Sequence, residues 1–245
     1  MRSSRSRFFE PEKESVFYCG LDLGQSKDYT AFCAIERRPG LTAVYHVRSL
    51  KRFRLGTSYP HIVERVRGAV KNPGIDPNLL LVDNTGVGAP VSDMMRREGL
   101  VFYPIMITGG ERVTRNGGHI HVPKRDLVSS LQVLFQTNRL KIAGQLQEAQ
   151  TLIDELENFR VKISLSGHDS YGAWREGSHD DLVLAVAMAC WAGEKRLLPK
   201  GLRWPRLNTG RRLLGSGKKV SGGSPLNRYH GPKLDFFVTW IGDTD

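Results

Sequence analysis

The feature that most constrains the fold of this chain is an apolar segment close to residue 185. Residues 182–193, LVLAVAMACWAG, contain no charged side chain. A helix that is apolar on all sides has to be buried on all sides, so other elements must surround it. The polar residues His179, Asp180 and Asp181 stand at its start, and Ser178 is the expected N-cap.

The segments before this helix predict a sheet. Residues 16–23, 30–36 and 41–53 are rich in β-branched and aromatic side chains and are separated by turn sequences, which predicts an antiparallel meander. Residues 78–84 and 100–108 are short, continuous apolar runs, which are typical of buried parallel strands. The predicted fold class is therefore α/β, with a mixed sheet in which three antiparallel strands are followed by parallel strands.

Helices are expected to flank this sheet, because several segments repeat their apolar residues at helical spacing. These segments are 58–72, 122–138 and 144–159, together with the second half of 86–99. A Gly-rich polar loop is predicted for 109–119, and a β-hairpin is predicted for 160–166 with 171–176.

Composition divides the chain into three parts. Residues 1–15 are predicted to be a disordered leader, and residues 16–196 a single domain. Residues 197–245 are predicted to be a basic, flexible tail that ends in a short apolar segment. Between residues 197 and 234 there are nine Lys or Arg and no Asp or Glu, which favours a solvated segment over a packed one.

The charge of the chain indicates a polyanionic partner. The formal net charge is +11 and the sequence pI is about 9.8, which favours nucleic acid over a membrane surface. No stretch approaches the roughly 20 apolar residues of a membrane span, and the N-terminus lacks the apolar core of a secretory signal. The three cysteines are not spaced as a disulfide framework or a zinc site. We therefore expect a soluble, cytoplasmic protein.

Four aspartates stand at comparable positions in the predicted elements. They are Asp22, Asp83, Asp180 and Asp181. The first lies within an apolar strand, where a carboxylate is costly unless a partner or a cation satisfies it. In open α/β sheets the functional crevice lies at the carboxyl ends of the strands, so the first two carboxylates are expected to be neighbours. A divalent cation would remove their repulsion, which makes a metal site the preferred interpretation.

Each aspartate also has a simpler interpretation. Asp83 precedes Asn-Thr-Gly and is suited to start a turn. Asp180 and Asp181 are suited to offset the dipole at the start of a helix. The metal site is preferred because of the combination and order of the four, and no single aspartate establishes it.

Four segments resemble the nuclease domain of phage large terminase subunits. These are GLDLGQSKDYTA, LLLVDNTGVGAPVSDMM, VPKRDLVSSLQVLFQTNRLKI and HDDLVLAVAMACW, and the likeness extends over about residues 16 to 195. That domain belongs to the ribonuclease H-like superfamily, with the RuvC-type resolvases. By this resemblance Asp22 and Asp83 match the first two catalytic acids, and the Asp180–Asp181 pair supplies the last.

The resemblance implies a function and a set of partners. The family cuts concatemeric double-stranded DNA during genome packaging with two divalent ions, Mg²⁺ or Mn²⁺. It implies a packaging ATPase motor, a small terminase and a portal as partners, and the cytoplasm of the host cell as the location. The chain has no room for the motor, so we expect either an isolated nuclease domain or a stand-alone relative.

Supporting residues and rival functions follow from the same segments. Lys124 and Arg125 begin a predicted helix and are candidates to bind DNA phosphates, although a solvated helix end is an equal alternative. His179 is a candidate auxiliary residue, as a metal ligand or proton carrier, although a partly buried structural histidine is the simpler role. The rival functions are a RuvC-like Holliday junction resolvase and a non-catalytic DNA-binding or assembly module of the same fold.

Overall fold

The structure is a computed structural model that describes residues 15–24, 28–76, 78–86, 89–163, 169–173 and 179–197. The predicted tail lies outside these residues except for its first position, and of the predicted leader only Ser15 lies within them. The described residues extend from the first strand to the last helix of the domain that was predicted for residues 16–196.

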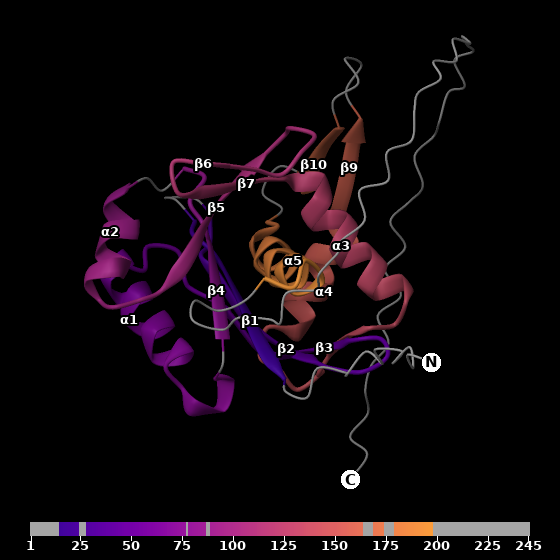
Figure 1. The fold of residues 1–245 in the computed structure, drawn as a ribbon, viewed down its shortest axis with the longest axis horizontal. Coiled ribbons are helices and arrows are strands. Elements are labelled where there is room, and N and C mark those ends of the chain that lie inside the picture. Colours follow the sequence, from indigo (N-terminus) through magenta and orange to yellow (C-terminus); the bar gives the residue numbers. More distant parts are fainter. Residues whose placement is uncertain are drawn as a thin grey trace, which may run out of the picture.

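Eight strands form one mixed sheet in the order β6-β7-β5-β4-β1-β2-β3-β8 (Figure 1). Their bounds are β1 (Val16–Asp22), β2 (Ala31–Arg38), β3 (Val44–Arg52), β4 (Asn78–Asp83), β5 (Phe102–Thr108), β6 (Thr114–Asn116), β7 (His119–Pro123) and β8 (Leu140–Ile142). The first three strands are antiparallel, and β1, β4, β5 and β7 run parallel. A separate hairpin joins β9 (Phe159–Ile163) and β10 (Asp169–Ala173). The predicted meander, parallel strands and hairpin are confirmed, although residues 164–166 and 174–176 of the predicted hairpin lie outside the described residues.

Helices cover both faces of the sheet (Figure 1). One face carries α1 (Tyr59–Val70) and α2 (Ala89–Arg97), with the 3₁₀ turn η1 (Pro73–Ile75) after α1. The other face carries α3 (Lys124–Gln136), α4 (Ala149–Asn158) and α5 (Asp181–Glu194). Every side chain from Asp181 to Gly193 is buried, because α3, α4 and the sheet enclose α5. The expectation that other elements surround the apolar helix is confirmed.

Three sequence predictions differ from the structure in detail. Residues 109–119 are not all loop, because β6 pairs with β7, and β7 continues to Pro123, where a helix was expected. In β7 the buried side chains Ile120 and Val122 alternate with partly exposed ones, a period of two that marks a strand. Helix α5 begins at Asp181 with Asp180 as its N-cap, and Ser178 lies outside the described residues.

The thiols agree with the simpler expectation from composition. Cys19, Cys33 and Cys190 are free and fully buried, as small apolar side chains often are. Within the described ranges, no helix combines the length and the apolar character that a membrane crossing requires.

The contact between β1 and α5 sets the position of the site. Alternation along β1 directs Tyr18, Gly20 and Asp22 to the face that α5 covers. A Cβ atom at Gly20 would lie 2.0 Å from the carbonyl oxygen of Ala185 in α5. The same oxygen accepts a hydrogen bond from the Cys33 thiol at 3.2 Å. Only glycine at this position of β1 allows the helix backbone to lie so close to the strand.

We predict that Gly20→Ala destabilises the protein by about 3 kcal/mol, because the new methyl group meets backbone and the helix has to move. Urea denaturation measures the change. The matched control is Gly68→Ala in α1, where an added Cβ meets nothing within 4 Å. That substitution is expected to stabilise the protein by about 0.5–1 kcal/mol, because alanine is the better helix former. Equal stabilities for the two variants would contradict the close approach of β1 and α5.

Candidate active site

Three separate elements bring the four aspartates to one end of the sheet. Asp22 ends β1 and Asp83 ends β4, and these strands are parallel neighbours with Leu21 opposite Val82. Alternation in both strands directs the two carboxylates to the face that α5 covers, since Tyr18 and Leu81 pack in the core on that side. The other two aspartates stand at the N-terminus of α5. The expectation that strand ends gather the carboxylates therefore agrees with the geometry.

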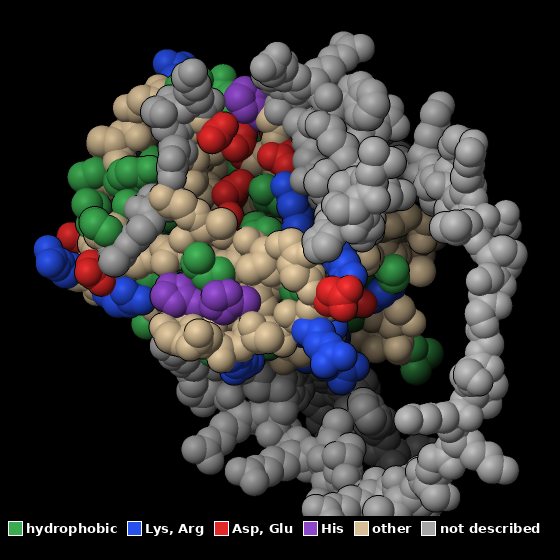
Figure 2. Space-filling model, turned by 90° about the horizontal axis from the view of Figure 1, so that it is seen from above, with side chains coloured by type: hydrophobic (Ala, Val, Ile, Leu, Met, Phe, Trp, Pro, Cys, Tyr) green, Lys and Arg blue, Asp and Glu red, His purple; other side chains and the backbone are tan. Residues whose placement is uncertain are grey.

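A cavity of about 320 Å³ opens between these elements. Its lining includes all four aspartates together with Asp28, His179 and Thr85. Figure 2 shows Asp and Glu side chains gathered in a hollow of this face, with a Lys or Arg side chain beside them. The cavity is therefore polar and strongly acidic, although the chain as a whole is basic.

Burial and mutual repulsion change the acidity of these carboxyl groups. Burial, followed by the charges of Asp83 and Asp181, raises the pKa of Asp22 well above its usual range. Burial also raises the pKa of Asp83. Burial and the charge of Asp180 raise the pKa of Asp181 to about 7. Without a cation, these groups therefore hold protons that ordinary carboxyl groups would have lost.

One protein cation already lies against the cluster. Lys124, the first residue of α3, places its Nζ 3.0 Å from Oδ2 of Asp180. Its charge also lowers the pKa of Asp22 and Asp83, although burial outweighs it. Lys124 thus compensates only part of the negative charge, and it ion-pairs with only one of the four aspartates.

The donor atoms fit a hard divalent cation. Oδ2 of Asp181 is buried and has no hydrogen-bond partner among the described residues, and Nδ1 of His179 lies 3.7 Å from it. A buried carboxylate oxygen without a partner is costly, and carboxylate oxygens are the preferred ligands of Mg²⁺ and Mn²⁺. Within the described part of the chain, no group of three or more His, Cys, Asp or Glu side chains is arranged to hold a metal ion. The fit therefore rests on donor chemistry, charge and the unpaired oxygen.

The turn after β4 holds Asp83 in place. The backbone N–H of Thr85 donates to Oδ1 of Asp83 at 2.8 Å, as expected for an aspartate that starts a turn. The Thr85 hydroxyl accepts the N–H of Ile107 at 2.7 Å, and the N–H of Asn84 donates to the Ile105 carbonyl at 2.8 Å. Both of these bonds tie the turn to β5. The turn role and the site role of Asp83 are therefore compatible.

A second set of hydrogen bonds supports the same turn. Oδ1 of Asn84 accepts from the Ser92 hydroxyl at 2.7 Å, and its Nδ2 lies 3.1 Å from Nε2 of His119. Nδ1 of His119 lies 3.1 Å from the Gly117 carbonyl oxygen. One tautomer satisfies all of these contacts, with the proton on Nδ1 and Nε2 as acceptor. No pattern in the linear sequence indicates this link, because β7 becomes a neighbour of the turn only in the folded sheet.

Of the supporting residues predicted from sequence, Lys124 and His179 lie at the acidic cavity and Arg125 does not. Lys124 borders the acidic cavity, and its Nζ also lies 5.8 Å from the centre of the Phe159 ring. Arg125 instead donates to the Glu111 carbonyl at 2.6 Å and is not part of the cavity lining. His179 lines the cavity, and its ring meets that of Tyr29 edge to face at 4.7 Å. Asp28, which sequence reasoning passed over, also lines the cavity.

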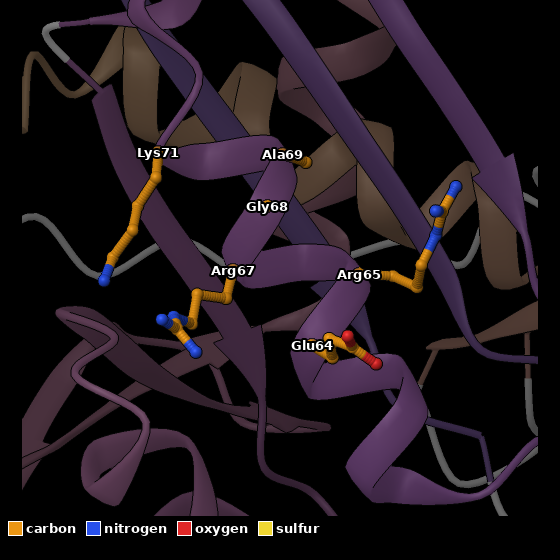
Figure 3. Close-up of a pocket in the computed structure, with 6 residues that line it drawn as sticks. All are labelled: Glu64, Arg65, Arg67, Gly68, Ala69 and Lys71. Atoms are coloured by element: carbon orange, nitrogen blue, oxygen red, sulfur yellow. The ribbon is translucent and has the colours of Figure 1, made fainter.

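A larger hollow of about 600 Å³ lies along α1 and has no such chemistry. Glu64, Arg65, Arg67 and Lys71 line it together with Gly68 and Ala69, and their side chains point in different directions (Figure 3). Arg67 is turned toward Glu98, with which it forms an ion pair at 3.0 Å. The polar groups there do not converge, so the acidic cavity is the better candidate site.

Sequence and structure comparisons agree on one class of protein. No model of a known protein family matches this sequence. Two relatives are terminase large subunits, from Thermus phage G20c and Thermus virus P23-45, each 25% identical over 181 residues. Those residues are 74% of this chain and 32% of each relative, so the chain spans about a third of their length.

Solved structures show the same fold. The large terminase nuclease of the thermophilic phage G20c matches with a TM-score of 0.55 and 22% identity, over 73% of this chain and 82% of that one. The HK97 bacteriophage large terminase matches with a TM-score of 0.51 and 15% identity, over 74% of this chain and 40% of that one.

The chain has a ribonuclease H-like fold with an acidic cavity at the carboxyl ends of its central strands. This fold is similar to that of the large terminase nuclease of phage G20c. The resemblance to phage large terminase subunits is confirmed by relatives of that name.

We predict that Asp181→Asn stabilises the metal-free protein at neutral pH. The folded wild type holds a proton on Asp181 up to about pH 7, whereas the unfolded chain loses it near the usual value of 3.8. Wild-type stability therefore falls relative to the variant as the pH rises from about 4 to 7. The expected difference at pH 8 is on the order of 1–2 kcal/mol, after allowance for solvent screening.

Urea denaturation in EDTA at pH 4 and pH 8 measures this difference. Asp93→Asn is the matched control, because Asp93 is exposed and pairs only with Arg96 in the described contacts. Its effect should be within about 0.5 kcal/mol at both pH values. If the difference in unfolding free energy between Asp181→Asn and wild type did not change with pH, the pKa of Asp181 would not be raised in the folded protein.

Proposed function

We propose that this chain is a divalent-metal-dependent endonuclease that hydrolyses phosphodiester bonds of double-stranded DNA. The observation that carries the proposal is the meeting of Asp22, Asp83 and the Asp180–Asp181 pair in one cavity, where Oδ2 of Asp181 is buried and has no hydrogen-bond partner among the described residues. The terminase large subunits among its relatives and the nuclease fold support the same activity. The net charge of +11 supports a polyanionic substrate.

The four aspartates are proposed to hold two ions, Mg²⁺ or Mn²⁺. Ions bound there would activate water and stabilise the leaving oxygen of the phosphodiester. Asp22 and Asp83 supply oxygens from the sheet, and Asp180 and Asp181 supply them from α5. Carboxylates bind ions only when deprotonated, so binding has to displace the protons that the raised pKa values retain. His179 is proposed as an auxiliary residue at the edge of the same cavity.

The biological setting is proposed from the relatives. We place the nuclease domain at residues 16–196 and propose that it cuts concatemeric viral DNA during genome packaging in the host cytoplasm. Its partners would be a packaging ATPase motor, a small terminase and a portal. The chain spans 32% of the terminase large subunits that it matches, so their remaining length leaves room for such a motor.

We predict that the purified chain converts supercoiled plasmid to nicked and linear forms with Mn²⁺ or Mg²⁺, and not with EDTA. Asp22→Asn should lower the rate by on the order of 100-fold or more, since even the outer partners of metal ligands are worth 10–100-fold. The fold and the affinity for DNA should stay close to wild type, because the substitution is isosteric. Gel assays of cleavage and of DNA binding measure both properties.

Asp93→Asn again serves as the control, with unchanged cleavage expected from an exposed carboxylate outside the cavity. Wild-type rates in Asp22→Asn would contradict the metal site. DNA binding without cleavage under any metal would favour the non-catalytic module. Preference for a four-way junction over linear duplex would favour the resolvase.

We further propose that Lys124 contacts a DNA phosphate beside the acidic cavity, and that Arg125 contributes less. The logarithm of the binding constant falls as the logarithm of the salt concentration rises, and removing one phosphate contact makes this negative slope shallower by about 1. Lys124→Gln is therefore expected to weaken DNA binding and to reduce that slope by about 1. Arg125→Gln should change the slope less, because its guanidinium already bonds the Glu111 carbonyl. Fluorescence anisotropy with duplex DNA in EDTA over a salt series measures both slopes, and equal slopes for wild type and Lys124→Gln would contradict the contact.

A further inference from the structure

The N-terminus of α5 is capped in an unusual way. Asp180 is the N-cap residue, and aspartate at this position usually accepts the N–H groups two or three residues further on. Here the Asp180 side chain makes no such bond. Oε2 of Glu155, in α4, accepts them instead, from Leu182 at 2.9 Å and Val183 at 3.1 Å.

Glu155 is also held in this position by Arg52, which itself packs on Tyr29. It is 6% exposed, and its other oxygen, Oε1, accepts from Nη1 of Arg52 at 3.3 Å. The guanidinium of Arg52 in turn lies over the Tyr29 ring, 4.4 Å from its centre. Strand β3, helix α4 and helix α5 therefore meet at this one carboxylate, and its orientation is fixed.

The Asp180 carboxylate does not cap the helix and can make other contacts. Oδ2 of Asp180 lies 3.0 Å from Nζ of Lys124, and Asp180 lines the acidic cavity. If the Asp180 side chain capped its own helix, at least one of its oxygens would turn to the N–H groups of α5. Capping by Glu155 leaves both Asp180 oxygens available to the cavity, so the capping by Glu155 and the position of Asp180 are linked.

We propose that Glu155 is a positioning residue, which caps α5 in place of Asp180 and so leaves the Asp180 carboxylate in the cavity as a metal ligand. This inference rests on the proposed function. It assigns a task to a buried acid that the nuclease mechanism does not otherwise use.

The cost of the arrangement argues that it is not an ordinary cap. Burial raises the pKa of Glu155 to about 8, although the Val183 N–H opposes this, and the charge of Asp181 raises it further. An Asp180 cap would need no second buried carboxylate, because that side chain already stands at the helix end. The helix is capped by the buried Glu155 carboxylate although Asp180 stands at the N-cap position. This is consistent with a separate use for Asp180.

The test compares Glu155→Ala with Glu155→Gln in the full chain. In Glu155→Ala the two N–H groups lose their acceptor, and the Asp180 side chain is expected to turn back and cap them. Glutamine keeps one oxygen acceptor, and both backbone bonds end on a single oxygen in the wild type. It should therefore preserve the position of Asp180 while losing the Oε1 acceptor that faces Arg52.

Isothermal titration with Mn²⁺ in the absence of DNA is the main readout. Glu155→Ala should raise the dissociation constant about 10–100-fold, as the loss of partners that orient metal ligands usually does. Glu155→Gln should remain within about 3-fold of wild type. A crystal structure of metal-free Glu155→Ala should show the Asp180 carboxylate bonded to the N–H groups of Leu182 and Val183.

The outcomes separate this inference from the proposed function. Mn²⁺ affinity of Glu155→Ala equal to wild type, with only the unfolding temperature lowered, would make Glu155 a simple helix cap and overturn the inference. In that case Mn²⁺ binding that depends on Asp22 would leave the proposed function intact. No Mn²⁺ binding by wild type at any pH above 7, or equal binding by Asp22→Asn, would overturn both.

Discussion

The close approach between the backbones of β1 and α5 governs the rest of this structure. Because Gly20 has no side chain, the carbonyl of Ala185 lies where a Cβ atom would otherwise be. Asp22 follows Gly20 by two residues, and Asp181 precedes Ala185 by one helical turn. One packing contact in the core therefore sets how far the carboxylate of the sheet lies from those of the helix. The apolar character of α5 serves the site as well as stability, because it holds the helix in this fixed position.

The acidic cavity gathers buried carboxyl groups, which lowers the stability of the folded protein. Buried carboxyl groups with raised pKa values repel one another in the acidic cavity, and Lys124 offsets only part of their charge. The surrounding structure resists their separation through two sets of bonds. Thr85 and Asn84 attach the turn after Asp83 to β5. Glu155 holds the start of α5. These bonds thereby keep the mutually repelling carboxyl groups close together.

The sequence predicts most of the sheet and the four aspartates, because both leave local signals. Asp22 stands out because an apolar strand surrounds it, and Asp83 because it ends an uninterrupted apolar run. β6 and β8 have three residues each, too few for a recognisable period, and only their neighbours in the sheet make them strands. Glu155 gives no local signal either. It lies among Leu152, Ile153 and Leu156 on a helix that also carries exposed acids, and only the packing of α4 against α5 shows what it contacts.

The order in which the elements occur along the chain has a consequence for synthesis. A ribosome finishes β1 to β8 and α1 to α4 before it reaches α5, the last described helix, which covers β1 and β2. Before residue 180 is made, α5 does not cover the central strands, and the nascent chain holds only the first two of the four aspartates. The acidic cavity therefore cannot form before α5 is made, and a fragment that ends before residue 180 has two of the four carboxylates and no central helix.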